Sequence, residues 1–375
     1  MMEALDDLEL GRRLTALTRD LILIRSTDAR PEERARCFEF VRIQLEGLEG
    51  VELREYEQEG YGSMVVLPKG VEVPEVLFCG HLDVVEHPKT VVYTSEVRDG
   101  RIYGPGAGDM KGALAIMLEL FRQEHERRPG ASLGLAITSD EECGGENGVK
   151  YLVEEEGLRC GRAIIPDGGS LTDLTVEEKG ILHLRLWTRG QAAHAARPWL
   201  GKNALSLIMQ RIRRLEDYFS GLEKVRGEGD RWYATCAVTM ARTANETVNR
   251  IPASAQAVLD VRFVPPETVE TMMVKIQEIL GEEVEVELIV SAEPTHLAAD
   301  PVFKEVTEAV IGKEVREVRA CGGSDGRFFR DVGIPVNLSR PLVGDLHSEK
   351  EWIDVESMVA YYRVCERYLE EKLKG

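Results

Sequence analysis

Histidines and carboxylates recur in this sequence directly after short apolar runs. Each apolar run has the composition of a strand buried on both faces, and strands of open α/β sheets bind ligands at their carboxyl ends. Two imidazoles and three carboxylates can hold two divalent cations if one carboxylate bridges them, which is a known arrangement for metal-assisted hydrolysis. The groups concerned are His81 and Asp83 after 76–79, Glu141 and Glu142 after 133–138, Asp167 after 163–165, His347 beyond 334–338, and Asp109, where GPGAG enters a helix.

The types of these side chains narrow the choice of metal. Nitrogen and oxygen ligands suit zinc, cobalt or manganese, and the lack of a thiolate cluster disfavours an iron–sulfur centre. Each piece alone is weak evidence, because a single His after a strand is usually structural and adjacent acids such as Glu141 and Glu142 usually form a solvated turn. The prediction of a metal site therefore depends on all the pieces together.

The glycine-rich stretch GPGAGD before residue 110 allows a second interpretation, a phosphate-binding loop. It lacks the G-K-[ST] ending of a P-loop, and Asp109 stands where a dinucleotide fingerprint has its third glycine. A carboxylate at that position repels phosphate, so the nucleotide interpretation is disfavoured.

The elements that must position these groups alternate between strands and helices, which predicts a mostly parallel sheet with helices on its faces. After about residue 178 the pattern changes to alternating apolar and polar strands, in the order strand, helix, strand, strand, helix, strand. That order is typical of a ferredoxin-like α+β domain. Expected helices span 12–24, 31–47, 111–128, 147–156, 203–219, 267–280, 301–311 and 355–372, and the expected strands of the second part span 180–189, 232–241, 254–263 and 283–290.

We therefore expect a small domain inserted into a larger α/β domain. The predicted boundaries are 1–178 and 292–375 for the two parts of the catalytic domain and 179–291 for the insertion. Two domains also suit a chain of 375 residues.

Composition excludes several classes of function. The formal net charge of −19 disfavours a nucleic-acid partner, because binding a phosphate backbone requires clustered cations. No apolar run approaches about 18–20 residues, and the acidic N-terminus does not resemble a signal peptide, so we expect neither a membrane span nor export. The 7 cysteines form no C-x-x-C pair, which disfavours a disulfide framework and agrees with a cytoplasmic location.

Several stretches of the chain resemble one known family, and the resemblance runs over nearly the whole sequence. The motifs are GHLDVV, RDGRIYGPGAGDMKGALA and TSDEECGG, followed by GQAAHAARPWLGKNAL, NRIPASAQAVLDVRF, GGSDGRFF and LHSEKEWI. They resemble the M20 family of dinuclear zinc metallopeptidases and deacylases, which includes acetylornithine deacetylases, succinyl-diaminopimelate desuccinylases and carboxypeptidase G2-like enzymes.

The resemblance implies a role for each residue of the predicted metal site. His81 and Asp167 would hold one Zn²⁺, Glu142 and His347 the other, and Asp109 would bridge both, with Co²⁺ or Mn²⁺ as possible substitutes. Asp83 would hydrogen-bond His81 and fix its tautomer. Glu141 would take a proton from a metal-bridging water and later give it to the leaving amine, as general base and acid.

The resemblance also implies roles in and near the inserted domain, which would act as a lid and dimerise. His194 would reach the active site of the partner in a homodimer and stabilise the oxyanion. Asn249 and Arg262 would contact the carboxylate of the substrate, and Gly323 and Ser324 would donate hydrogen bonds to it. Without the resemblance, these positions read as a surface histidine, a turn cap, an exposed strand charge and a glycine-rich turn.

The function implied is hydrolysis of the amide bond of a small N-acyl amino acid, of the deacetylase or desuccinylase type. A carboxypeptidase or dipeptidase acting on short peptides is the alternative within this class, and a catalytically inactive binding protein is the alternative outside it. The sequence departs from the family at Pro105, where many members have Arg, and at Asp167, where desuccinylases usually carry Glu. These departures leave the substrate open.

Overall fold

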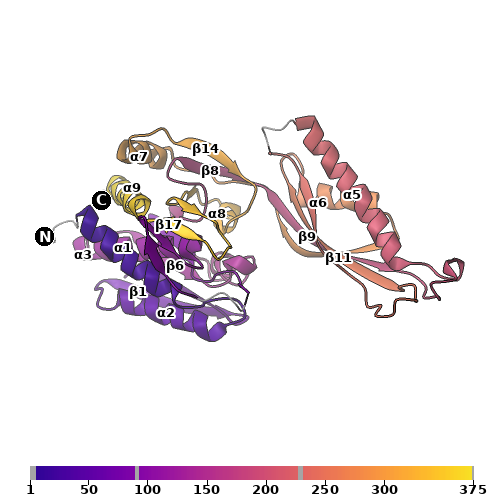
Figure 1. Cartoon of the computed structure of the whole chain (residues 1–375). Coiled ribbons are helices and arrows are strands. Elements are labelled where there is room, and N and C mark those ends of the chain that lie inside the picture. The colour runs from indigo at the N-terminus through magenta and orange to yellow at the C-terminus, as the bar shows by residue number, and fades with distance from the viewer. Residues whose placement is uncertain (1–5, 89–92, 227–230, 374–375) are drawn as a thin grey trace. The chain divides into compact units, whose positions relative to one another are not determined.

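The computed structural model describes residues 6–88, 93–226 and 231–373, which divide into two compact units (Figure 1). The larger unit comprises 1–176, 296–320 and 324–375, and the smaller unit comprises 177–295 and 321–323. The chain therefore builds nearly all of the smaller unit in one insertion, and only 321–323 are added to it later in the sequence.

A nine-stranded mixed sheet forms the centre of the larger unit. Its four middle strands run parallel, whereas its other pairs with determined direction are antiparallel. The order is β1 (Val51–Gln58), β2 (Tyr61–Pro68), β6 (Leu133–Thr138), β3 (Val76–His81), β7 (Arg162–Ile165), β15 (Val336–Leu338), β8 (Asp173–Glu178) and β13 (Thr295–His296), with β14 (Arg316–Ala320) beside β8.

Helices cover both faces of this sheet, which explains the continuous apolar runs in its central strands. Every residue of β3 and β6 is buried. Alternate residues of β3 belong to different cores: Val76 and Phe78 pack into one, and Leu77 and Cys79 into the other. The first core includes residues of α1 (Asp7–Ile22), α2 (Pro31–Leu45), α3 (Gly112–Arg127), α7 (Pro301–Ile311) and α9 (Val355–Lys372), and the second includes residues of α4 (Val149–Glu154) and α8 (Gly326–Asp331).

The helices begin close to the residues that the sequence predicts, with one clear exception. α1 begins at Asp7 rather than at residue 12, because the side chain of Asp6 accepts a hydrogen bond from the Glu9 amide and caps the helix. α2 begins at Pro31, whose fixed φ suits the first turn of a helix.

A second, smaller sheet joins two distant segments of the larger unit. Its order is β16 (Val343–Gly344), β17 (Trp352–Asp354), β5 (Arg101–Tyr103) and β4 (Glu96–Arg98), and the sequence did not predict these strands. Trp352 pairs with Tyr103, so the chain that follows β5 lies beside the hairpin between β16 and β17. This sheet thereby brings the loop that contains Asp109 next to the loop that contains His347.

The smaller unit is a four-stranded antiparallel sheet with two helices, in the order that a ferredoxin-like fold requires. Residues of β11 alternate strictly between buried and less buried, and the buried set packs into a core of this unit alone. Its elements are β9 (Gly180–Arg189), α5 (Ala204–Arg226), β10 (Thr235–Arg242), β11 (Ser254–Phe263), α6 (Val269–Leu280) and β12 (Val284–Ala292), with a sheet order of β10-β11-β9-β12.

The parallel centre of the large sheet and the α+β character of the smaller unit confirm the predicted fold class. Within the described residues, no helix combines the length and the apolar character needed to cross a membrane.

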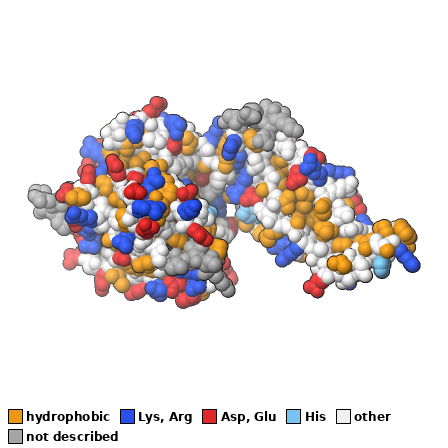
Figure 2. Space-filling view, viewed as in Figure 1, with side chains coloured by type: hydrophobic (Ala, Val, Ile, Leu, Met, Phe, Trp, Pro, Cys, Tyr) orange, Lys and Arg blue, Asp and Glu red, His pale blue; other side chains and the backbone are white. Residues whose placement is uncertain are grey.

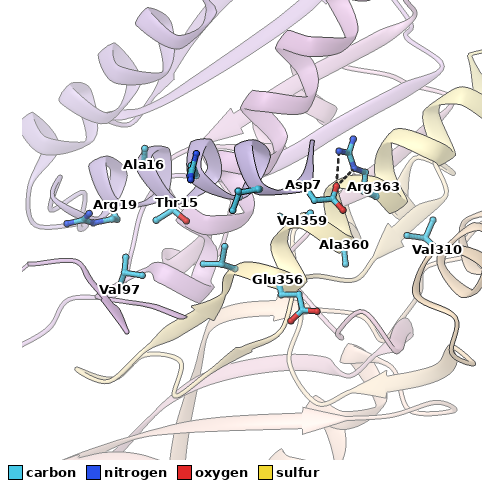
Figure 3. A pocket seen from close by; sticks show the side chains of 14 residues that line it. Asp7, Thr15, Ala16, Arg19, Val97, Val310, Glu356, Val359, Ala360 and Arg363 are labelled. Carbon is cyan, nitrogen blue, oxygen red and sulfur yellow. Dashed lines mark hydrogen bonds and ion pairs between the residues drawn. The ribbon is translucent and has the colours of Figure 1, made fainter. Parts of the chain in front are cut away.

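A groove of about 990 Å³ lies between α1 and α9 of the larger unit (Figure 3). Its wall is largely apolar and includes Gly11, Ala16 and Val359, with the ion pair of Asp7 and Arg363 among its lining residues. None of the predicted site residues lines this groove, so the groove is separate from the predicted catalytic residues.

Candidate metal centre

Five predicted ligands and Glu141 come together in the larger unit, at the carboxyl edge of its parallel strands. His81 is the last residue of β3, Asp167 follows β7, and Glu141 and Glu142 form a short turn after β6. Asp109 lies in the irregular turn Ala107–Lys111 before α3, and His347 lies between β16 and β17. The edge is common to these segments because β3 runs parallel to both β6 and β7.

The first group of side chains surrounds the imidazole of His81. Its Nε2 lies 3.2 Å from Asp109 Oδ1, 3.9 Å from Glu141 Oε2 and 3.9 Å from Asp167 Oδ2. Ligand atoms about 2.0–2.1 Å from a tetrahedral cation lie roughly 3.3 Å apart, so these separations are close to those of a metal site.

The second group surrounds the imidazole of His347. Its Nε2 lies 3.3 Å from Asp109 Oδ2 and 3.5 Å from Glu142 Oε2. Asp109 thus directs one oxygen to each histidine, which is the geometry of a carboxylate shared between two neighbouring cations.

Buried polar atoms at this centre lack the hydrogen bonds that buried groups normally make. Within the described part of the chain, His81 Nε2, Asp109 Oδ1 and Glu142 Oε1 have no hydrogen-bond partner. A pair of divalent cations, one beside each histidine, would satisfy these three atoms. The donor set and its geometry therefore fit the pair of metal ions that the sequence predicts.

The crowding of these acids perturbs their protonation in the protein without metal. Burial raises the pKa of Glu141 and of Asp167 well above the usual range, and in Asp167 the charge of Asp109 adds to the effect. Burial opposes the charge of His81, but its close contacts with the carboxylates of Asp109 and Asp83 outweigh burial and raise its pKa. The contacts of His347 with Asp109 and Glu142 raise its pKa to about 10. A cation at the centre would stabilise the carboxylate forms instead.

Asp83 holds His81 and the turn after β6 in place. The main-chain oxygen of Asp83 lies 3.0 Å from His81 Nδ1, and its carboxylate Oδ1 lies 3.4 Å from the same nitrogen. Asp83 Oδ2 accepts a hydrogen bond from the Glu142 amide at 3.0 Å. With Nδ1 engaged in this way, Nε2 of His81 is directed toward the metal centre.

Three of the predicted site residues, His194, Asn249 and Arg262, belong to the smaller unit. His194 is exposed, and its segment pairs with the one that carries Asn249, since the Ala195 amide donates to Asn249 O at 2.7 Å. Arg262 binds the carboxylate of Asp260 with two hydrogen bonds, of 2.7 and 3.0 Å.

Gly323 and Ser324 stand where the chain passes between the units before α8. Gly323 is half-buried and is grouped with the smaller unit. Ser324 is buried in the larger unit, and its hydroxyl accepts a hydrogen bond from the Gly326 amide at 3.2 Å. The hydroxyl of Ser324 therefore has a local partner at the start of α8.

Two residues that contact the centre were not selected from the sequence. Arg340, two residues after β15, lies with Nη1 3.4 Å from Asp167 Oδ1. Glu351 accepts hydrogen bonds from the amides of Gly106, Gly108 and Asp109. The rule that singled out Asp167, a polar side chain at the carboxyl end of a strand, also applies to Arg340, whereas nothing in the sequence pattern marks Glu351.

Two imidazoles and several carboxylates converge at the carboxyl edge of the parallel strands, and this arrangement, together with a ferredoxin-like unit, is typical of a metal-dependent hydrolase of the two-cation class. Residues 77–371 match the model of peptidase family M20/M25/M40, so the chain belongs to this family. It is accordingly a hydrolase of amide bonds, as predicted.

Relatives and solved structures agree with this assignment. Succinyl-diaminopimelate desuccinylase of Thioalkalivibrio sulfidiphilus is 28% identical over 363 residues, with 91% of this chain and 94% of the relative covered. Aminopeptidase PepT of Bacillus cereus superposes with a TM-score of 0.76 at 21% identity, covering 97% of this chain and 99% of that one. A metallo-carboxypeptidase of the M20 family from Sulfolobus solfataricus superposes with a TM-score of 0.76 at 17% identity, with 99% of each chain covered. At these identities the solved structures establish the fold alone.

Proposed function

We propose that this enzyme removes the acyl group from a small N-acyl amino acid with a free carboxylate, in a deacylation of the desuccinylase type. The observation that carries the proposal is the carboxylate of Asp109, whose two oxygens face the imidazoles of His81 and His347 at 3.2 and 3.3 Å. The curated relatives of 26–29% identity, named succinyl-diaminopimelate desuccinylase, support the substrate class.

The metal ligands that we propose are divided between two cations. His81 and Asp167 hold one, Glu142 and His347 hold the other, and Asp109 bridges both. When bound, two divalent cations polarise the amide carbonyl and lower the pKa of water, and Zn²⁺ suits these nitrogen and oxygen donors, with Co²⁺ or Mn²⁺ as substitutes. The candidate ligand atoms form two groups, and within each group they lie within 4.8 Å of one another. One group consists of His81, Glu141 and Asp167, and the other of Asp109, Glu142 and His347, which supports this division of the ligands.

Glu141 serves in this proposal as the general base and then the general acid. Its carboxylate accepts a proton from the attacking water and returns it to the nitrogen of the leaving amine. Glu141 Oε2 lies 3.9 Å from His81 Nε2, and the side chain is only 16% exposed, so the proton is held away from bulk solvent. Asp83 assists by fixing the imidazole of His81, as its contact with Nδ1 supports.

The smaller unit has two proposed tasks, closing over the substrate and forming a homodimer. We assign residues 179–291 to this domain, with 1–178 and 292–375 forming the catalytic domain. Strand β10 is an edge strand of the sheet in the smaller unit. Figure 2 shows hydrophobic side chains on the face of this unit that is turned to the viewer. Three large apolar side chains of this unit are exposed: Trp199 is 76% exposed, Met240 is 56% exposed and Val248 is fully exposed. Exposed apolar side chains of this kind support the binding of a protein partner to this unit.

Five residues in and near this domain have proposed contacts with the substrate. His194 of one subunit stabilises the oxyanion in the active site of its partner, and Asn249, Arg262, Gly323 and Ser324 bind the carboxylate of the substrate. Arg262 would exchange its present partner Asp260 for that carboxylate, since both are planar acceptors for a guanidinium fork. A cytoplasmic location is supported by the cysteines, all 7 of which are free thiols.

Peptidase activity on short peptides is the second candidate. It is supported by the likeness in fold to proteins named aminopeptidase and carboxypeptidase. Both activities use the same metal centre, so only the substrate distinguishes them.

The test combines metal analysis with a panel of substrates. Protein loaded with Zn²⁺, Co²⁺ or Mn²⁺ is assayed on N-acetyl and N-succinyl amino acids and on dipeptides, and we expect two ions per chain and turnover of acyl substrates. Glu141→Gln is expected to lower kcat by about 10²–10⁴-fold, and the variant should still bind both ions. The control Glu146→Gln, which alters an exposed acid paired with Lys150, should behave as wild type.

Two results would contradict the proposal. A metal content near zero in the wild-type protein after loading would exclude a mechanism that uses two cations. Turnover of dipeptides alone would replace the deacylase assignment with the peptidase one.

A further inference from the structure

Glu351 makes four hydrogen bonds with the loop that carries Asp109, three through its side chain and one through its main chain. It is 1% exposed. Its Oε1 accepts hydrogen bonds from the amides of Gly108 and Asp109, each at 2.8 Å, and its Oε2 accepts one from the Gly106 amide at 3.2 Å. Its main-chain oxygen accepts a fourth, from the Gly104 amide at 3.0 Å. One residue therefore binds four amides of the loop that ends in Asp109.

The same residue belongs to the segment that carries the second histidine. Glu351 follows His347 by four positions and directly precedes β17, which pairs with β5. Gly108 packs against this segment, because a Cβ built on Gly108 would lie 2.8 Å from Leu346 Cδ2. The loops of Asp109 and His347 are thus in direct contact, and the carboxylate of Glu351 connects them.

The hydrogen bonds of Glu351 reach the main chain of Asp109 itself. The amide of Asp109 is fixed by Glu351 on one side, while its two side-chain oxygens face His81 and His347 on the other. A carboxylate shared by two cations must keep both of its oxygens at the correct positions. A small rotation of the main chain at Asp109 would therefore move one oxygen away from each cation position. Groups that orient metal ligands typically contribute 10–100-fold to metal affinity.

We propose that Glu351 is a positioning residue, which fixes the carboxylate of Asp109 between the two cation positions and ties it to the loop of His347. The inference rests on the proposed function, which assigns Asp109 and His347 as ligands. Glu351 itself touches neither cation nor substrate and acts through the main chain of residues 106–109.

Glu351→Gln tests this role at constant size. Glutamine keeps one carbonyl oxygen but replaces the other acceptor with an amino group, which cannot accept a hydrogen bond from an amide. The matched control is Asp354→Asn, three residues along the same segment, where the carboxylate caps the Ser357 amide of α9 instead of the Asp109 loop. Each metal-free protein is titrated with Zn²⁺ and Co²⁺, and the visible absorption of the Co²⁺ form and the rise in Tm on metal addition are recorded.

We expect Glu351→Gln to bind both metals about 10–100-fold more weakly than wild type, with an altered Co²⁺ spectrum and a smaller metal-induced rise in Tm. Asp354→Asn should match wild type in all three measurements. Glu351→Asp keeps the charge on a shorter side chain and is expected to give an intermediate affinity.

Several outcomes would overturn the assignment. Wild-type metal affinity and spectrum in Glu351→Gln would make Glu351 a structural residue only, even if its metal-free Tm falls. Failure of both Glu351 variants to fold, with Zn²⁺ in excess, would likewise assign the residue to folding. A wild-type protein that binds no metal would refute the proposed function itself, which keeps the two failures distinct.

Discussion

The two histidines of the candidate metal centre are held in very different ways. His81 ends a buried strand, is 1% exposed at its side chain, and has its Nδ1 engaged by Asp83. His347 lies on a short hairpin, has a side chain that is 53% exposed, and adopts a left-handed φ of 58°. The cation next to His347 is therefore expected to exchange more readily than the one next to His81.

This difference predicts the effect of His347→Asn. Asparagine tolerates a left-handed φ, but it removes the imidazole contacts with Asp109 and Glu142, so the free energy of unfolding of the metal-free protein should fall by about 0.2–1 kcal/mol, as for a half-exposed ion pair. We expect one of two bound ions to be lost and turnover to fall sharply, as checked by metal analysis, urea unfolding and assay. His296→Asn, at an exposed histidine outside the centre, is the control. Two ions held at wild-type affinity would exclude His347 as a ligand.

Sequence reasoning located the side chains at the centre but not those that support the loops. His81, Glu142 and Asp167 were found because each follows an apolar run and because strand ends share one edge. Glu351 escaped detection because its partners are main-chain amides, which are the same in every residue type. Arg340 was missed although its position after β15 obeys the rule that selected Asp167.

At the scale of elements, Asp300 joins four parts of the larger unit. It caps α7 through the Val302 amide, and its Oδ2 binds Arg162 of β7 as well as Tyr368 and Lys372 of α9. Its own amide donates to Asn337 Oδ1 on β15 at 2.8 Å. Burial opposes the charge of Asp300, but the contacts with Lys372 and Tyr368 outweigh it and lower the pKa.

Asp300→Asn is expected to lower the free energy of unfolding by about 1.5–3 kcal/mol at neutral pH, because charge-assisted hydrogen bonds are lost in a largely buried position. The folded-state pKa lies below the unfolded value of about 3.9, so this contribution is complete above that value and disappears as the pH falls through the folded pKa. Urea unfolding at several pH values should show the difference from wild type shrinking below about pH 4.

Glu55→Gln is the control for this prediction, since Glu55 is half-exposed and paired with Arg42 at the surface. It should change stability by less than about 1 kcal/mol. A difference between Asp300→Asn and wild type that stays constant down to pH 2 would show that the charge of Asp300 is not the cause.

The long elements and the short buried strands β7 and β15 were predictable, whereas the short strands of the second sheet were not. Strands β9 and β11 and helices α7 and α9 match their expected ranges, because their apolar periodicity extends over ten or more residues. Helix α5 continues to Arg226, beyond the expected end at 219. The strands β4, β5, β16 and β17 have two or three residues each, too few for any periodicity. Yet these strands bring the Asp109 and His347 loops together, so the final step in assembling the centre depends on contacts that sequence patterns do not encode.

At the scale of the molecule, each unit has hydrophobic cores of its own. The two cores that flank the large sheet contain only residues of the larger unit, and the third contains only residues of the smaller one. All five proposed ligands and Glu141 belong to the larger unit. Metal binding should therefore stabilise one unit directly and leave the stability of the other unchanged.

Scanning calorimetry with and without a chelator tests this separation. Two unfolding transitions are expected for the metal-loaded protein. Cations at 100 times their dissociation constant contribute about 2.7 kcal/mol per site to the folded state that binds them. For a unit of this size, about 1 kcal/mol corresponds to roughly 2–4 °C in Tm, so chelation should lower one transition by at least about 5 °C and leave the other in place.

Gly180→Ala identifies the transition of the smaller unit. A Cβ at this position of β9 would lie under 3 Å from the ring of Phe263 on β11, and such overpacking costs about 1–3 kcal/mol. The variant should lower only the transition that chelation leaves unchanged. If chelation and Gly180→Ala both shifted a single common transition, the two units would unfold as one cooperative body, and metal binding would stabilise the smaller unit as strongly as the one that holds the ligands.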